Sequence, residues 1–174
     1  VEKLREALGL AMAPRRIECF DISTIQGSET VGAMVVSEDG RMVRHEYRKY
    51  RVRRNGGTGN PDDFAAIHEV VLRRYRRLLE EGGPFPDLVI VDGGKGQLSA
   101  AYGAFQELGL GNLVAIGIAK REELVVMRDR SDPIALPSSS VALHMLQRVR
   151  DEAHRFAVTF HRKARRKRIL RSEL

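Results

Sequence analysis

The feature that most constrains the fold is a short run of branched apolar residues that ends in an acid. Residues 88–91 (LVIV) are followed by Asp92 and then by residues 93–97 (GGKGQ). A strand without polar alternation is typical of a sheet that is covered on both faces. Ligand sites of open α/β sheets lie at the carboxyl ends of such strands, where glycine permits close approach. We therefore expect an α/β protein with a site beside Asp92.

A second acid lies in similar surroundings near the start of the chain. Asp21 falls within the β-type run 17–22 (IECFDI), where it shares a face with Cys19. If neighbouring strands hold Asp21 and Asp92 together, the carboxylates repel unless a cation lies between them or one stays protonated. Carboxylate oxygens with water suit Mg²⁺ or Mn²⁺. For either acid alone, a structural carboxylate bonded to backbone or to an arginine is the alternative.

The remaining pattern predicts a mixed sheet flanked by helices. The expected elements are strands over 17–22, 30–37 and 42–52, a helix over 62–81, a strand over 88–92, a helix over 97–108, a strand over 114–119, a hairpin of 124–128 with 134–136, and a long helix from 139 or 140 to about 168. This order is the plan of the ribonuclease H-like fold, expected here with a five-stranded mixed sheet.

Composition is that of one globular domain. The chain has 174 residues, of which 43% are hydrophobic, enough for a sizeable core. We interpret 1–13 as the linker remnant of an upstream region and 14–174 as the domain. No run approaches the ~18–20 apolar residues of a membrane span. Cys19 is the single cysteine, and it is expected to lie in the core of its strand. The absence of an internal disulfide suits a reducing, cytoplasmic location.

Positive charge is concentrated at the end of the chain. The net charge is +7, and residues 145–174 hold ten Lys/Arg against three Asp/Glu, whereas residues 1–144 hold twenty of each. A phosphate backbone attracts such a stretch, and a solvated helix end is the alternative. The candidate DNA-binding cations are Arg150, Arg162, Lys163, Arg165 and Arg166.

The last predicted helix carries a third candidate site residue. Its apolar stripe faces the sheet, and His154 lies next to that stripe, at the boundary of core and solvent. A ligand or proton-transfer group at this position can reach the sheet, although a lone helical histidine is more often structural.

Lys95, which follows Asp92 closely, can meet a phosphate or pair with the acids, and it completes the set of candidate DNA-binding cations. The run 93–97 does not match a nucleotide-triphosphate loop, because the spacing is short and Gln97 replaces the hydroxyl residue. Asp62 and Asp63 can supply a further carboxylate, but capping and first-turn charge for the following helix is the interpretation we favour.

Four motifs together resemble a known family. They are 18–23 (ECFDIS) with 26–27 (QG), 62–66 (DDFAA), 91–98 (VDGGKGQL) and 142–157 (ALHMLQRVRDEAHRFA). In this order they resemble the carboxyl-terminal endonuclease domain of UvrC, the bacterial nucleotide excision repair nuclease, over 14–174. Family members often carry histidine at the position of Thr24, so any part that this histidine plays in binding DNA or metal is absent from this chain.

The resemblance implies a ribonuclease H-like fold with an Asp21–Asp92–His154 site. Asp21 and Asp92 would hold Mg²⁺ or Mn²⁺, and His154 would ligate the ion or handle a proton. It also implies cutting of damaged double-stranded DNA on the 5′ side of a lesion, with UvrB as a partner through regions outside this chain. We expect the fragment to be a monomer with no membrane partner. The alternatives are a non-catalytic DNA-binding domain whose acids brace the fold, or another ribonuclease H-like nuclease such as a junction resolvase.

Overall fold

The computed structural model describes residues 1–25, 29–53, 63–119 and 124–173, and it leaves the side chains of residues 25 and 160–173 undescribed. The elements are α1 (Glu2–Leu8), β1 (Arg16–Ile25), β2 (Glu29–Glu38), β3 (Arg41–Met42), the 3₁₀ turn η1 (Arg44–Glu46), β4 (Arg48–Arg51), α2 (Asp63–Glu81), β5 (Leu88–Asp92), α3 (Lys95–Glu107), β6 (Ala115–Ile118), β7 (Val125–Met127) and α4 (Val141–Glu173).

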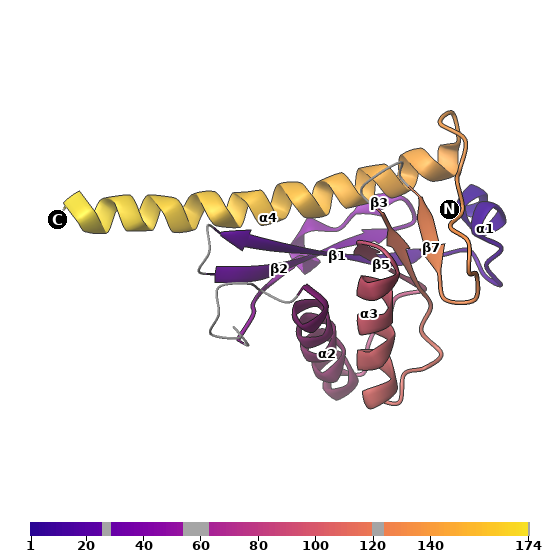
Figure 1. Ribbon diagram of the computed structural model, residues 1–174, viewed down its shortest axis with the longest axis horizontal. Coiled ribbons are helices and arrows are strands. Elements are labelled where there is room, and N and C mark those ends of the chain that lie inside the picture. Colours follow the sequence, from indigo (N-terminus) through magenta and orange to yellow (C-terminus); the bar gives the residue numbers. More distant parts are fainter. Residues whose placement is uncertain (26–28, 54–62, 120–123, 174) are drawn as a thin grey trace.

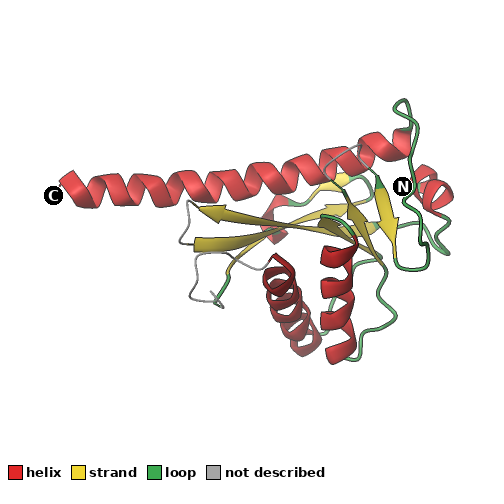
Figure 2. Ribbon diagram, viewed as in Figure 1, coloured by secondary structure: helices red, strands yellow, loops and turns green. Residues whose placement is uncertain are grey.

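The strands form one mixed sheet in the order β3-β2-β1-β5-β6-β7, with β4 also paired to β2. The central strands β1, β5 and β6 are parallel, whereas β2 and β7 run antiparallel to their neighbours. Helices α2 and α3 lie on one face, and α4 runs along the other (Figures 1 and 2). The predicted mixed sheet flanked by helices, with a long carboxyl-terminal helix, is confirmed.

In the described residues the sheet has seven strands rather than the five predicted, because the run 42–52 is broken in two and β7 also joins the sheet. β3 pairs with the end of β2, whereas β4 pairs with its middle. Between them η1 brings Glu46 to the Arg16 guanidinium, with Arg16 Nη2 3.2 Å from Glu46 Oε1. The next residue, Tyr47, donates a hydrogen bond to Glu152 of α4 at 2.6 Å. These two side-chain contacts require a bend that a continuous strand would not provide.

The predicted hairpin near residue 130 is reduced to β7 and a single bridge between Val125 and Ile134. Pro133 precedes Ile134 and has no N–H with which to extend the ladder.

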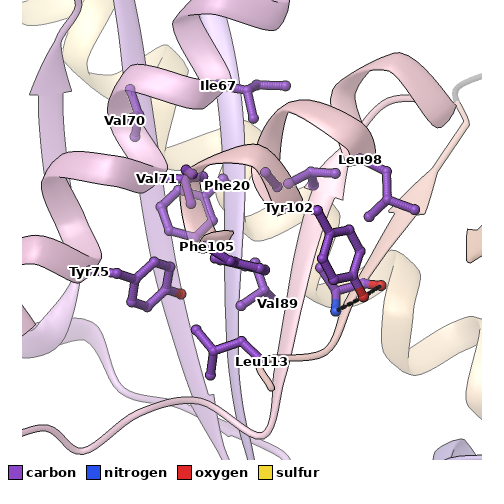
Figure 3. Packing of buried hydrophobic residues seen from close by; sticks show 14 of the residues in the cluster. Phe20, Ile67, Val70, Val71, Tyr75, Val89, Leu98, Tyr102, Phe105 and Leu113 are labelled. Atoms are coloured by element: carbon purple, nitrogen blue, oxygen red, sulfur yellow. Dashed lines mark hydrogen bonds between the residues drawn. The ribbon is translucent and has the colours of Figure 1, made fainter. Parts of the chain in front are cut away.

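A core of aromatic and branched residues fills the space between the sheet and helices α2 and α3 (Figure 3). Tyr75 lies at its centre, with ring centroids 6.0 Å from Phe20 and 5.7 Å from Phe105 in edge-to-face geometry. Such pairs add stabilisation beyond the area that they bury. The α2–α3 face is therefore a well-packed support for β1 and β5.

The opposite face of β1 and β5 packs on α4. Cys19 and Ile90 lie in this second core with Leu146 and Ala153 of α4, and Cys19 is buried and free, as predicted. Side chains alternate along a strand, so Asp21 and Asp92 continue the two rows that begin with Cys19 and Ile90. The packing of α4 thus decides what the two acids face.

The amino-terminal helix joins this second core. Leu4 and Leu8 of α1 are buried there, and α1 contacts α4. Part of the segment 1–13 thus packs on the domain, and its interpretation as a linker remnant stays a prediction. Among the described helices, none is long and apolar enough to cross a membrane.

Candidate active site

Strand register brings the two acids next to one another. Cys19 pairs with Ile90 and Phe20 pairs with Val91 in the parallel β1–β5 ladder, so Asp21 and Asp92 are the next residues in that register. Asp21 is 4% exposed, and Asp92 is half-buried at the last position of β5. The site therefore lies where β5 ends and β1 continues.

His154 approaches the acid pair from α4. Its Nδ1 lies 3.6 Å from Asp21 Oδ2, and the histidine side chain is 68% exposed while that of Asp21 is 6% exposed. The distance exceeds that of an ordinary hydrogen bond, but it allows charge attraction when the imidazole is protonated. Ala153, the preceding residue, is fully buried, so the helix presents His154 at the edge of its packed face.

The Cys19 thiol lies close enough to the candidate site for the charges of the site to influence its pKa. Burial raises the pKa of its thiol well above the ordinary value, the carboxylates of Asp21 and Asp92 raise it further, and Arg150 opposes them. The acids and Arg150 therefore act on the same buried atom. Arg150 has an 18% exposed side chain, 3.3 Å from Asp151 Oδ1, so this predicted DNA-binding cation is turned toward the domain rather than presented on an open surface.

The acid pair fits a hard divalent cation. Asp92 Oδ1 is buried and accepts no hydrogen bond from any described residue. A buried carboxylate oxygen without a donor is costly, and carboxylate oxygen is the ligand that Mg²⁺ and Mn²⁺ favour. In the described part of the chain, however, no three His, Cys, Asp or Glu side chains gather closely enough to enclose an ion. An ion here would need water or substrate oxygens to complete its coordination.

The glycines after Asp92 shape the turn from β5 into α3. Gly93 has a φ of 155°, and a Cβ at this position would lie 2.5 Å from the Gln97 side chain. Gln97 Oε1 accepts a hydrogen bond from the Gly94 N–H at 3.0 Å. The close approach expected from the sequence is thus made by a side chain of the following helix, which fixes the end of β5 and with it Asp92.

A cavity of about 320 Å³ opens beside Asp92 on the α2–α3 side. It is lined by Ile22, Asp63, Ile67, Asp92, Gly93, Gly94, Gln97 and Ala119. Asp63, the first residue of α2, therefore shares a cavity with Asp92, a position that sequence reasoning missed in favouring a helix-capping role. The only available signal was the Asp62-Asp63 pair, of which Asp62 lies outside the described residues.

The other predicted residues are spread over the molecule. Lys95 is exposed at the first position of α3, and Thr24 is exposed on β1. Arg162, Lys163, Arg165 and Arg166 belong to the carboxyl-terminal part of α4, the end of which runs beyond the sheet (Figure 1), and their side chains lie outside the described part. The motif residues 26–27 also lie outside it.

The fold is similar to that of the human ENDOV crystal structure. The TM-score is 0.57 at 14% sequence identity, with 94% of this chain and 91% of that chain covered. At that identity the likeness concerns the fold alone.

Curated relatives share much more sequence. UvrABC system protein C of Gloeobacter violaceus is 53% identical over 173 residues, 98% of this chain, and that of Koribacter versatilis is 52% identical over 172 residues. The chain spans 28% of the length of both proteins. The sequence model of the UvrC RNase H endonuclease domain matches residues 5–158, which also confirms the predicted ribonuclease H-like fold. The chain therefore belongs to the UvrC RNase H endonuclease domain family.

Proposed function

We propose that this chain is a metal-dependent DNA endonuclease domain that makes the 5′ incision beside a lesion in nucleotide excision repair. The observation that carries the proposal is that Asp92 lies next to Asp21 in the strand register and His154 of α4 lies 3.6 Å from Asp21, with Asp92 Oδ1 buried without a donor among the described residues. Family membership supports endonuclease chemistry. Because the chain spans about a quarter of its curated relatives, the substrate and partners of the whole protein belong to the proposal.

The proposed roles follow from exposure and geometry. Asp21 and Asp92 would hold Mg²⁺ or Mn²⁺, which, when bound, supplies stabilisation of phosphate charge and a more acidic water. His154 is the exposed member, with Nδ1 facing Asp21. Its other ring nitrogen, Nε2, is then the atom that accepts or donates a proton, and Asp21 orients the ring. Asp21 is buried within β1, so its carboxylate is already in position before a cation or DNA binds.

Damaged double-stranded DNA is the proposed substrate, and UvrB is the proposed partner through regions outside this chain. The net charge of +7 favours a nucleic-acid substrate.

The first test is anomalous diffraction from crystals of the chain soaked in Mn²⁺, because it does not require turnover. We expect a peak within coordination distance of Asp21 and Asp92, and its loss in crystals of Asp92→Asn. A Mn²⁺ peak elsewhere only, or none at saturating metal, would contradict the metal site.

The second test is cutting of a labelled lesion duplex already nicked on the 3′ side of the lesion. We expect scission on the 5′ side with Mg²⁺ or Mn²⁺, and none with EDTA or in His154→Ala. Salt-sensitive binding without scission in any metal would favour a DNA-binding module, and preference for a four-way junction would favour a resolvase. For the Asp92→Asn variant of the first test, Asp39→Asn, which removes an exposed turn carboxylate, is the control for loss of one negative charge.

A further inference from the structure

A second cavity, of about 250 Å³, lies between α3 and β7 and is not part of the candidate active site. Its described lining consists of Lys95, Leu98, Ser99, Tyr102, Gly103, Gln106, Met127 and Arg128. We call it the α3–β7 pocket. Lys95 is the third residue after Asp92, so the pocket begins beside the candidate site and continues along α3 from there.

One cation of the pocket is held on a fixed aromatic platform. The guanidinium carbon of Arg128 lies 4.5 Å from the centroid of the Tyr102 ring. The Tyr102 hydroxyl accepts a hydrogen bond from the Ala115 N–H at 3.0 Å and donates one to the Ala115 carbonyl at 3.2 Å. The ring is therefore fixed to β6 at its far end. A guanidinium stacked on a ring keeps its N–H groups available at its edge for an anion.

The pocket is positively charged and lacks an acid among its described lining residues. Within the described residues, neither Lys95 nor Arg128 forms an ion pair, whereas Arg16, Arg74 and Arg155 all do. Ser99 and Gln106 add neutral hydrogen-bond donors. Two cations beside neutral donors, without a carboxylate, form a site for a phosphate group.

We propose that the α3–β7 pocket binds a backbone phosphate of the DNA strand, with Lys95 and Arg128 as its two cationic contacts. This inference rests on the proposed function, because the pocket would guide along α3 the DNA strand that is cut at Asp21 and Asp92. The ligand chemistry is a phosphate group, and the position of Lys95 beside the site favours DNA over a free phosphate. Stacking of Arg128 before binding lowers the ordering cost of the contact.

The test compares two double variants that lose the same charge. Lys95→Gln/Arg128→Gln removes both cations of the pocket, and Arg41→Gln/Arg76→Gln removes two exposed arginines outside its described lining. Binding of the whole chain to a fluorescent duplex is measured by anisotropy in EDTA over a series of salt concentrations. We expect the pocket variant to lose affinity on the order of tenfold. The slope of log K against log salt should fall by about 0.9 for each lost phosphate contact.

Chemical shifts locate the contact and separate the two phosphate sources. Adding the oligonucleotide to the isotopically labelled chain should shift the backbone amides of Ser99, Gly103 and Arg128, and inorganic phosphate at equal phosphate concentration should shift them less. Equal affinity losses in the two double variants would overturn the proposal. Shifts with inorganic phosphate but not with DNA would also overturn it, as would the absence of salt-dependent DNA binding. Thermal unfolding checks that both variants fold.

The inference and the proposed function fail in different ways. If the wild type binds DNA through the pocket but does not cut in Mg²⁺ or Mn²⁺, the proposed function is wrong and the pocket stands. If cutting depends on Asp21 while both double variants bind alike, the pocket is wrong and the function stands.

Discussion

Two acids three residues apart on β1 have opposite surroundings. Glu18 faces α2 and is 0% exposed. Arg16 Nε and Arg74 Nη2 donate to Glu18 Oε2, each at 3.1 Å, and the Tyr75 hydroxyl donates to Oε1 at 2.8 Å. Arg16 in turn contacts Glu38 and Glu46. Glu18 is thus the centre of a closed network in which protein groups serve both carboxylate oxygens.

Asp21 faces the opposite side of the sheet, toward α4. The next strand presents another acid to the same side, and Asp92 Oδ1 accepts no hydrogen bond within the described residues. The exposed side chain of His154 approaches Asp21 from α4, with Nδ1 3.6 Å from Asp21 Oδ2. This fold can thus satisfy a buried acid completely, as it does Glu18. For Asp92 Oδ1, which has no donor among the described residues and lies beside a second acid, we infer that a bound ligand supplies the partner.

Breaking the closed network should have the largest effect. Glu18→Gln leaves Arg16 and Arg74 buried with less compensating charge, because their side chains are only 7% and 8% exposed. We expect the free energy of unfolding to fall by about 3–5 kcal/mol, measured by urea denaturation. The exposed pair of Asp39 with Arg15 offers the control Asp39→Asn, expected within about 1 kcal/mol of the wild type. A similar small loss for Glu18→Gln would contradict the comparison.

Removing the site acid should affect cutting instead of folding. Asp21→Asn keeps the size of the side chain but removes the charge that we assign to cation binding. We expect cutting of the lesion duplex to slow by about 10²–10³-fold, the rate equivalent of roughly 3–4 kcal/mol. The unfolding midpoint should not fall. A cutting rate equal to that of Asp39→Asn would remove Asp21 from the site.

Metal should stabilise only a chain with both site acids. At a Mn²⁺ concentration about ten times the dissociation constant, the folded state gains about 1.4 kcal/mol. For a domain of this size, that raises the unfolding midpoint by about 3–6 °C. Asp92→Asn should lose this shift, whereas Glu18→Gln, although less stable, should keep it. Calorimetry with and without Mn²⁺ measures this shift of the unfolding midpoint. An undiminished shift in Asp92→Asn would place the metal elsewhere.

The smallest expected effect has the opposite sign to the first. Without metal, Asp92→Asn relieves repulsion between two neighbouring carboxylates. We expect a gain of about 0.5–1 kcal/mol in the free energy of unfolding, as is common when a functional site loses a strained charge. Asp39→Asn should show no gain, because it breaks an ion pair with Arg15. Destabilisation of Asp92→Asn in EDTA would mean that this acid supports the fold as Glu18 does.

The sequence predicted helices and strands well where the spacing of their apolar residues alone decides which face is buried. The apolar run before Asp92 is β5, and the amphipathic run after Asp63 is α2. The spacing of apolar residues did not predict the structure where side chains from distant parts of the chain contact one another. The break between β3 and β4 depends on Glu46 reaching Arg16 and on Tyr47 reaching Glu152, and neither contact leaves a local trace.

The same limit applied to the candidate site. The motifs singled out Asp21, Asp92 and His154. Strand register places Asp92 beside Asp21, and the packing of α4 brings His154 to Asp21. The position of Asp63 in the cavity of Asp92 and the platform of Tyr102 under Arg128 were not predictable. The first depends on how α2 packs on the sheet, and the second on how α3 packs beside β7.

The sequence by itself determined the strand and helix periods and the family, and it supplied the candidate site acids, because these are properties of neighbouring residues and of motif order. Only the tertiary structure decided which side chains surround each acid of β1. Residues 18 and 21 point to opposite faces of a strand, and their surroundings come from Arg74 and Tyr75 on one side and His154 on the other. Charge compensation acts through space over a few ångströms, so it is set by packing rather than by distance along the chain.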